Sequence, residues 1–148
     1  MIEFKKPKRF VEKVFIHCSD SDIASHDDIL IIKKWHVEEN GWDDVGYHFI
    51  ILNGALRPKL TVLSMDGQVQ VARDLQYQGA HTKGHNDSIG ICLIGVKWFT
   101  DAQIASAKKL ILDLAEQYPS IKEVKGHCDY DDNKTCPNFD VLRTVLVG

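Results

Sequence analysis

The sequence has no apolar run long enough to cross a membrane as a helix, which excludes a helical membrane protein. Residues 1–9 are basic, but no apolar segment of signal-peptide length follows them. Internal repeats, low-complexity tracts and interdomain linkers are also missing from the 148 residues. We therefore expect a single domain over residues 1–148 that is made in the cytoplasm without a secretion signal.

The sequence also has little excess charge and few cysteines. Its 18 basic and 21 acidic residues give a formal net charge of −3, so no broad surface for nucleic-acid phosphates is expected. Without a secretion signal, the cysteines are expected to be free thiols or metal ligands rather than disulfides. A chain with 44% hydrophobic residues can bury a core without such cross-links. The cysteines are Cys18, Cys92, Cys128 and Cys136.

Short runs of β-branched and aromatic residues alternate with helical patterns along the chain. Ser25 is a candidate N-cap for a helix that ends before Gly41. Thr100 and Gln103 form a capping box for a second helix, which extends through Tyr118. The runs that predict strands span residues 14–18, 47–52, 68–72, 88–94 and 123–127. This alternation predicts an α/β fold, with a central mixed β-sheet flanked by helices in a single domain.

The stretch that follows the second predicted strand has a different character. Asn53 to Val62 contains Gly54 and Pro58, which favour a loop or an irregular segment. Asp66-Gly67 is a strong signal for a tight turn before the next strand.

Two histidines and a cysteine stand where this fold would hold a ligand. His17 ends the first predicted strand, His127 ends the last, and Cys136 follows nine residues later. A catalytic zinc site uses three protein ligands and an open position for water, and such sheets bind ligands beyond their strand ends. The spacing alone does not select these residues, because an isolated histidine is more often a hydrogen-bonded or surface residue.

Residues 44–51, Asp-Val-Gly-Tyr-His-Phe-Ile-Ile, resemble the signature of the type 2 N-acetylmuramoyl-L-alanine amidase family, in particular its small phage lysozymes. Further segments similar to that family occur in its order, at residues 15–19, 35–42, 79–86, 88–93, 126–127 and 134–140. The resemblance runs from about residue 12 to the C-terminus. It implies one amidase catalytic domain over residues 1–148, with the fold that peptidoglycan recognition proteins share.

The resemblance implies that His17, His127 and Cys136 are the ligands of Zn²⁺. Two imidazoles and a thiolate leave the ion a formal charge of +1, and this ligand set favours zinc by its softness. Such a zinc ion polarises a carbonyl and lowers the pKa of a bound water to about 7.

Three further roles follow from the same resemblance. Tyr47 matches a catalytic tyrosine, which could orient water or protonate the leaving amine. Lys134 matches a catalytic lysine, whose ammonium could stabilise the oxyanion. His81 matches a histidine that borders the substrate groove. Taken without the resemblance, a tyrosine at the position of Tyr47 is more often a core or rim aromatic, and a loop lysine such as Lys134 is usually solvated.

Several residues near these positions receive a structural interpretation or none. Cys18, Cys92 and Cys128 are expected to be small core residues, and His48 has no assigned role. Asn53 to Met65 is longer than the short hairpin that the phage enzymes would have there. This excursion could extend a wall of the groove, or it could be a tolerated surface insertion.

The function implied by the resemblance is cleavage of the amide between N-acetylmuramic acid and L-alanine in peptidoglycan, by a phage or prophage endolysin that is a monomer. A cytosolic amidase that recycles soluble muropeptides is a rival within the same class. A non-catalytic peptidoglycan-binding module is a second alternative, but such members lack the cysteine ligand, and this chain has Cys136. The phage relatives also bind and inhibit their phage's RNA polymerase, so that polymerase is a candidate partner.

Overall fold

The computed structural model describes residues 10–18, 47–57, 60–72, 75, 87–95, 99–129, 137 and 141. For residues 53–57, 60–65 and 127 it describes the backbone alone. Among the described residues, no helix is both long and apolar enough to span a membrane. The elements are β1 (Lys13–Cys18), β2 (Phe49–Arg57), β3 (Leu60–Val71), β4 (Ile89–Leu93), α2 (Asp101–Gln117), β5 (Glu123–Gly126) and the 3₁₀ helix η3 (His127–Asp129).

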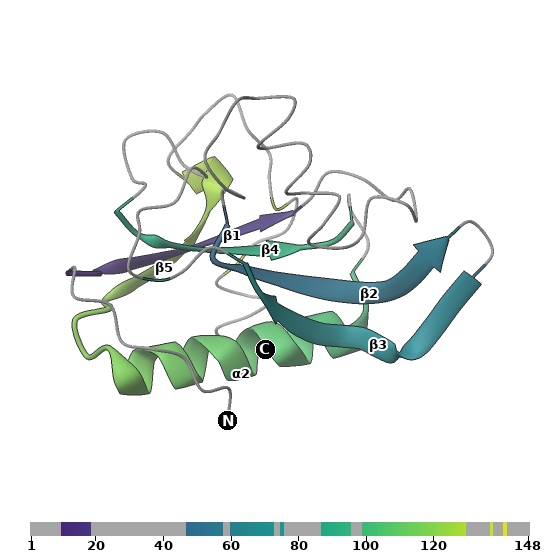
Figure 1. Ribbon diagram of the computed structural model, residues 1–148. Coiled ribbons are helices and arrows are strands. Elements are labelled where there is room, and N and C mark those ends of the chain that lie inside the picture. The colour runs from purple at the N-terminus through teal and green to yellow at the C-terminus, as the bar shows by residue number, and fades with distance from the viewer. Residues whose placement is uncertain are drawn as a thin grey trace.

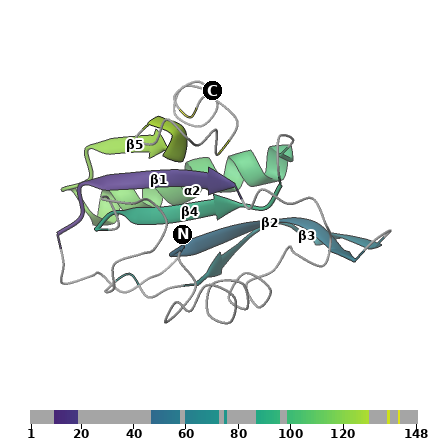
Figure 2. The ribbon, with the colours of Figure 1, turned by 90° about the horizontal axis from the view of Figure 1, so that it is seen from above.

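The five strands form one mixed sheet, in the order β3-β2-β4-β1-β5 (Figures 1 and 2). β1 is parallel to both β4 and β5, and β2 is parallel to β4. β3 is antiparallel to β2 and occupies one edge. The continuous apolar sequences of β1 and β4 match their central positions, because inner parallel strands are buried on both faces. The predicted mixed sheet of an α/β fold is confirmed.

The helix α2 lies along one face of the sheet (Figure 1). Its buried residues, which include Leu110 and Leu114, pack on alternate residues of the strands, such as Ile16, Phe49 and Ile91. The predicted capping box is confirmed, since Thr100 Oγ1 accepts from the Gln103 N–H at 3.0 Å and Gln103 Oε1 accepts from the Thr100 N–H at 2.9 Å. The helix predicted after Ser25 lies outside the described residues.

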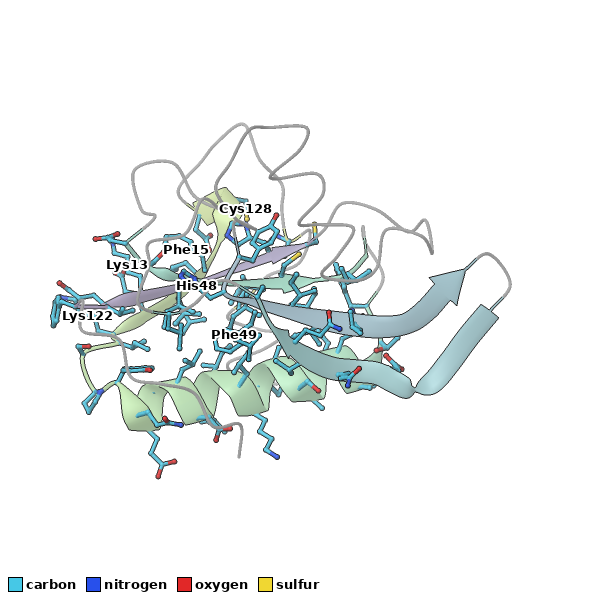
Figure 3. All side chains as sticks on the ribbon, viewed as in Figure 1. Lys13, Phe15, His48, Phe49, Lys122 and Cys128 are labelled. Carbon is cyan, nitrogen blue, oxygen red and sulfur yellow. The ribbon has the colours of Figure 1, made fainter. Side chains whose placement is uncertain are left out.

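A second, smaller cluster covers the opposite face of the sheet. It consists of Ile50, Leu52, Cys92 and Ile94, and Tyr47 and Ala72 pack against it. Because neighbouring residues of a strand point to opposite faces, β1, β2 and β4 each contribute one set of side chains to α2 and another set to this face. Figure 3 shows Phe49 directed toward α2 and Phe15 directed away from it.

The loop predicted over Asn53 to Val62 is wrong. β2 continues to Arg57, and β3 begins at Leu60, so the two strands form one long antiparallel ribbon that extends past the other strands (Figure 1). Gly54 and Pro58 favour irregular structure locally, but pairing with the neighbouring strand supplies backbone hydrogen bonds that a local pattern cannot indicate. The pairing is irregular, with register shifts along this part of the ribbon.

The tight turn predicted at Asp66-Gly67 is also wrong, because both residues lie inside β3. The left-handed backbone of Gly67, with φ of 81°, belongs to a bulge, where β2 advances from Ile51 to Asn53 while β3 advances by one residue more. The bulge rests on the start of α2. A Cβ on Gly67 would lie 2.8 Å from the Ala102 carbonyl oxygen, so only glycine fits this approach.

Candidate metal centre and active site

The sheet register brings two predicted metal ligands to the same end of adjacent strands. β1 and β5 pair in parallel, with Ile16 opposite Gly126. His17 follows Ile16, and His127 follows Gly126 as the first residue of η3. The backbones of both histidines therefore lie side by side at the carboxyl ends of their strands, which is where a sheet with parallel strands collects ligands.

The position of Pro137 indicates where the chain runs after the next predicted ligand. Pro137 is buried, and a Cβ built on Gly126 would lie 2.8 Å from its Cδ atom. Gly126 precedes His127, and Pro137 follows Cys136, so the residues next to these two predicted ligands are in contact. Cys136 itself lies outside the described residues, as do Lys134 and His81.

His17 and Tyr47 lie together on the face of the sheet opposite α2. His17 is 1% exposed, and its neighbour Ile16 belongs to the core under α2, so the imidazole points the other way. The ring centroids of His17 and Tyr47 are 5.2 Å apart, with the ring planes inclined at 51°. Tyr47 is half-buried, so its ring meets the second cluster while part of it reaches solvent. Two of the residues to which the family resemblance assigns functions are thus in contact.

Cys92, in β4, is a neighbour of both His17 and Tyr47. It is opposite His17 in the register of β1 and β4, and it is fully buried. Burial raises the pKa of the Cys92 thiol well above its usual value, and the neighbouring Cys18 adds to the rise. A hydrogen bond with the Tyr47 side chain lowers the pKa of this thiol in part. The thiol is therefore protonated, and the Tyr47 hydroxyl lies beside it.

The core positions predicted for the other cysteines are confirmed in two cases and wrong in the third. Cys18 and Cys92 are buried, whereas Cys128 is half-buried, because it belongs to η3 and not to a strand. All three are free thiols. Cys128 lies on the same side of the sheet as Phe15 (Figure 3), beside the turn that carries His127.

Two polar residues near the site had no role in the sequence-based interpretation. His48 is fully buried, and its Nδ1 accepts a hydrogen bond from the Gly90 N–H at 3.0 Å. A histidine that is buried in an otherwise apolar run needs a hydrogen-bond partner. This need was the signal in the sequence that could have indicated a structural role for His48. Asp129 accepts from the Gly126 N–H at 2.8 Å, which closes the turn around His127. Its spacing of three residues from Gly126 is typical of such turns.

The described side chains contain no cluster of three or more metal-ligating groups. Of the three predicted ligands, only His17 has a described side chain. The donor chemistry fits zinc nevertheless: the imidazole of His17 is buried, the backbone of His127 lies beside that of His17, and Pro137, the residue after Cys136 in the sequence, contacts Gly126.

Comparison with known proteins shows the family to which the chain belongs. The sequence profile of the N-acetylmuramoyl-L-alanine amidase family matches residues 7–139. The endolysin of Enterobacteria phage T3 is 37% identical over 147 residues, covering 93% of this chain and 87% of the relative. The endolysin of Escherichia phage T7 is 34% identical over 151 residues, covering 96% of this chain and 89% of the relative.

Solved structures show the same fold. The N-acetylmuramoyl-L-alanine amidase LysC from Clostridium intestinale URNW superposes with a TM-score of 0.73 at 22% identity, covering 95% of this chain and 87% of that chain. Drosophila PGRP-LB superposes with a TM-score of 0.70 at 26% identity, covering 91% and 79%. The family profile, the phage relatives and the fold agree, and this chain belongs to the N-acetylmuramoyl-L-alanine amidase family.

Proposed function

We propose that the protein is an endolysin, which hydrolyses the amide bond between N-acetylmuramic acid and L-alanine in peptidoglycan with the help of Zn²⁺. The observation that carries the proposal is twofold: the backbones of His17 and His127 lie side by side at the carboxyl ends of β1 and β5, and the ring of Tyr47 contacts the ring of His17. His17 and His127 follow paired residues of β1 and β5, and the Tyr47 ring is 5.2 Å from the His17 ring. Relatives named endolysins, which this chain matches over nearly its full length, support the same function.

The proposed zinc ligands are His17, His127 and Cys136. The contact between Pro137 and Gly126 supports this set, because each of these two residues is the sequence neighbour of a proposed ligand, Cys136 and His127 respectively. Bound in this way, Zn²⁺ would polarise the amide carbonyl and make hydroxide available near neutral pH. The hydrogen bond from the Gly126 N–H to Asp129 would keep the His127 turn in one conformation before the metal binds.

We assign the proton transfer to Tyr47 and the stabilisation of negative charge to Lys134. Hydrolysis adds water across the amide: the carbonyl carbon gains oxygen, the C–N bond breaks, and the amine of L-alanine leaves with a proton. A half-buried tyrosine beside His17 suits this proton transfer, since its ring is fixed and its edge still reaches solvent. The ammonium of Lys134 would face the oxyanion, and His81 would border the substrate groove.

Several features of the proposed lysis role rest on family resemblance alone. The enzyme would reach the cell wall from the cytoplasm after another protein opens the membrane, and it would act as a monomer. Binding to a phage RNA polymerase also stays a prediction. A pull-down with the polymerase of the cognate phage would test it.

The proposed function is tested by digesting purified sacculi and identifying the products by mass spectrometry. We expect free stem peptides that begin at L-alanine, together with intact glycan strands. A strong chelator should abolish the release, and added Zn²⁺ should restore it. Shortened glycan strands or peptides cut internally would contradict the proposal. Sedimentation with the sacculi without cleavage would favour a binding module, and much faster cleavage of soluble muropeptides would favour a recycling amidase.

A further inference from the structure

We propose that His48 is a positioning residue, whose imidazole clamps the start of β2 to β4 and so holds the catalytic Tyr47 against His17. This inference rests on the proposed function, because it assigns to His48 an effect on the step that Tyr47 performs. His48 precedes β2 directly and is the residue after Tyr47. Its position therefore determines where the Tyr47 side chain begins.

The backbone of His48 is bonded to strands on both sides. Its N–H donates to the Gly90 carbonyl at 2.9 Å, and its own carbonyl accepts from the Ala72 N–H at 2.8 Å. Gly90 belongs to β4, and Ala72 directly follows β3. His48, the residue between Tyr47 and β2, is thus hydrogen-bonded to β4 on one side and to the residue after β3 on the other.

The imidazole of His48 closes a second hydrogen bond to the same residue of β4. Gly90 donates its N–H to His48 Nδ1 at 3.0 Å, so both backbone groups of Gly90 bond to His48. An Nδ1 that accepts a hydrogen bond carries no proton, which fixes the ring as the neutral tautomer with its hydrogen on Nε2. The ring is fully buried, so water does not compete for the Gly90 N–H. Figure 3 shows His48 in the middle of the sheet.

β4, to which His48 is hydrogen-bonded, also contacts the side chain of Tyr47. Cys92 lies two residues beyond Gly90 on β4, belongs to the cluster on which Tyr47 packs, and is opposite His17 in the register. The clamp at Gly90 and the contact at Cys92 therefore hold Tyr47 to β4 at two places. Without the clamp, the residue after Tyr47 loses one of its two bonds to β4, and the tyrosine ring can shift relative to His17.

Three substitutions of His48 separate the position of the acceptor from the volume of the ring. Asparagine places its side-chain oxygen where Nδ1 stands, glutamine places its oxygen one bond further out, and leucine provides no acceptor. Each variant is purified with zinc, and kcat, KM, zinc content and melting temperature are measured with sacculi or soluble muropeptides as substrate. Nuclear magnetic resonance records the imidazole nitrogens of the wild type and the Overhauser contact between the His17 and Tyr47 rings of every variant.

We expect His48→Asn to keep kcat within about threefold, and His48→Gln and His48→Leu to lower kcat about tenfold or more. KM and zinc content should change little, because the clamp acts on Tyr47 and not on the metal. The wild-type Nδ1 should be unprotonated, and the contact between the His17 and Tyr47 rings should weaken in the glutamine and leucine variants alone. If leucine prevents folding, the pair of asparagine and glutamine decides.

Equal loss of kcat in all variants, or full kcat in His48→Leu, would overturn the positioning role. A proton on Nδ1 of the wild type would overturn the clamp itself. If the wild type cleaves no wall substrate, the proposed function fails, and the ring contact measured in the three variants still decides whether His48 holds Tyr47 in place.

Discussion

Tyr47 has two structural neighbours with different chemistry, the imidazole of His17 and the thiol of Cys92. The ring contact with His17 gives it a fixed distance to a proposed metal ligand, and the hydrogen bond with Cys92 occupies its hydroxyl. These two contacts hold the tyrosine beside the proposed metal ligand before a substrate binds. A bound substrate would offer the hydroxyl a second hydrogen-bond partner. Substitutions of single residues such as Tyr47 therefore test the proposed chemistry most directly.

Replacing Tyr47 with phenylalanine removes the hydroxyl and keeps the ring. We expect Tyr47→Phe to lower kcat roughly 10²-fold, because the leaving amine loses its proton donor. Zinc content and melting temperature should stay close to those of the wild type, which metal analysis and calorimetry check. Tyr118→Phe is the matched control, since it removes a hydroxyl from a buried tyrosine at the end of α2. Equal kcat in the two variants would remove Tyr47 from the mechanism.

Lys134 is tested by removing its ammonium group. Lys134→Ala should lower kcat roughly 10²-fold, because the oxyanion loses a positive charge, and it should leave zinc content unchanged. Lys125→Ala, at an exposed position of β5, provides the control and should be fully active. Steady-state kinetics on muropeptides distinguish the two. An active Lys134→Ala variant would show that the role does not carry over from the family.

Cys136 and Cys128 offer a direct comparison of a proposed ligand with a nearby thiol. Cys136→Ser should lose most bound zinc and most activity, because a serine hydroxyl is a poor substitute for a thiolate. Cys128→Ser should retain both, since Cys128 follows His127 in η3 and is not among the proposed ligands. Metal content measured by plasma mass spectrometry gives the answer. The reverse pattern would assign the third ligand to Cys128.

At the scale of secondary structure, Gln103 joins the start of α2 to the sheet. Its side chain completes the capping box with Thr100, and its Nε2 donates to the carbonyls of Ile51 at 3.1 Å and Ile94 at 2.9 Å. Ile94 also donates its N–H to the Ile51 carbonyl at 3.1 Å. One buried amide therefore joins the helix cap to β2 and to the residue after β4.

Removing this amide should destabilise the fold more than losing a helix cap alone. Gln103→Leu keeps a similar volume but leaves the Thr100 N–H and the Ile94 carbonyl without their bonds to this side chain. We expect a loss of roughly 2–4 kcal/mol in the free energy of unfolding, from several buried hydrogen bonds. Urea denaturation measures it, with Gln117→Leu, at a half-buried position in the last turn of the same helix, as the control. A loss no larger than that of the control would contradict the role of Gln103.

Much of the fold could be predicted from the sequence, because its signals are local. β1, β4 and α2 lie within one or two residues of the predicted ranges, since apolar runs and the box of Thr100 and Gln103 specify them without distant partners. The strands predicted at residues 47–52 and 68–72 match the start of β2 and the end of β3, but the outer part of this ribbon could not be predicted, because its pairing overrides the local signals of Gly54 and Asp66-Gly67.

Part of the candidate site could likewise be predicted from the sequence, and part could not. His17 and Tyr47 were identified by resemblance to a family, and the structure places them in contact. The clamp of His48 joins residues 42 positions apart in the chain, so no local pattern could indicate it. The roles of Lys134, Cys136 and His81 stay predictions, since these residues lie outside the described part of the chain.

At the scale of the whole molecule, a zinc ion would join the ends of β1 and β5. Metal that binds only the folded chain stabilises it in proportion to its affinity. We expect removal of zinc by a chelator to lower the melting temperature by several degrees, and re-addition of zinc to restore it. Calorimetry of the wild type measures this shift, and Cys136→Ser serves as a control that should not respond. An unchanged wild-type melting temperature after confirmed metal loss would contradict a ligand set that spans the two strands.

The sheet order has a consequence for how the protein is made. Of the described strands, β1 is the first to leave the ribosome, yet it lies between β4 and β5, and β5 is the last of them to be made. Its N–H and carbonyl groups pair with β4, which is synthesised about 75 residues later, and with β5, about 110 residues later, and pairing over such separations is slow. In the proposed zinc site, His17 comes from the first of the described strands and His127 follows the last of them. An enzyme that binds zinc in this way would therefore lack its metal site until η3 had been synthesised, about 110 residues after His17.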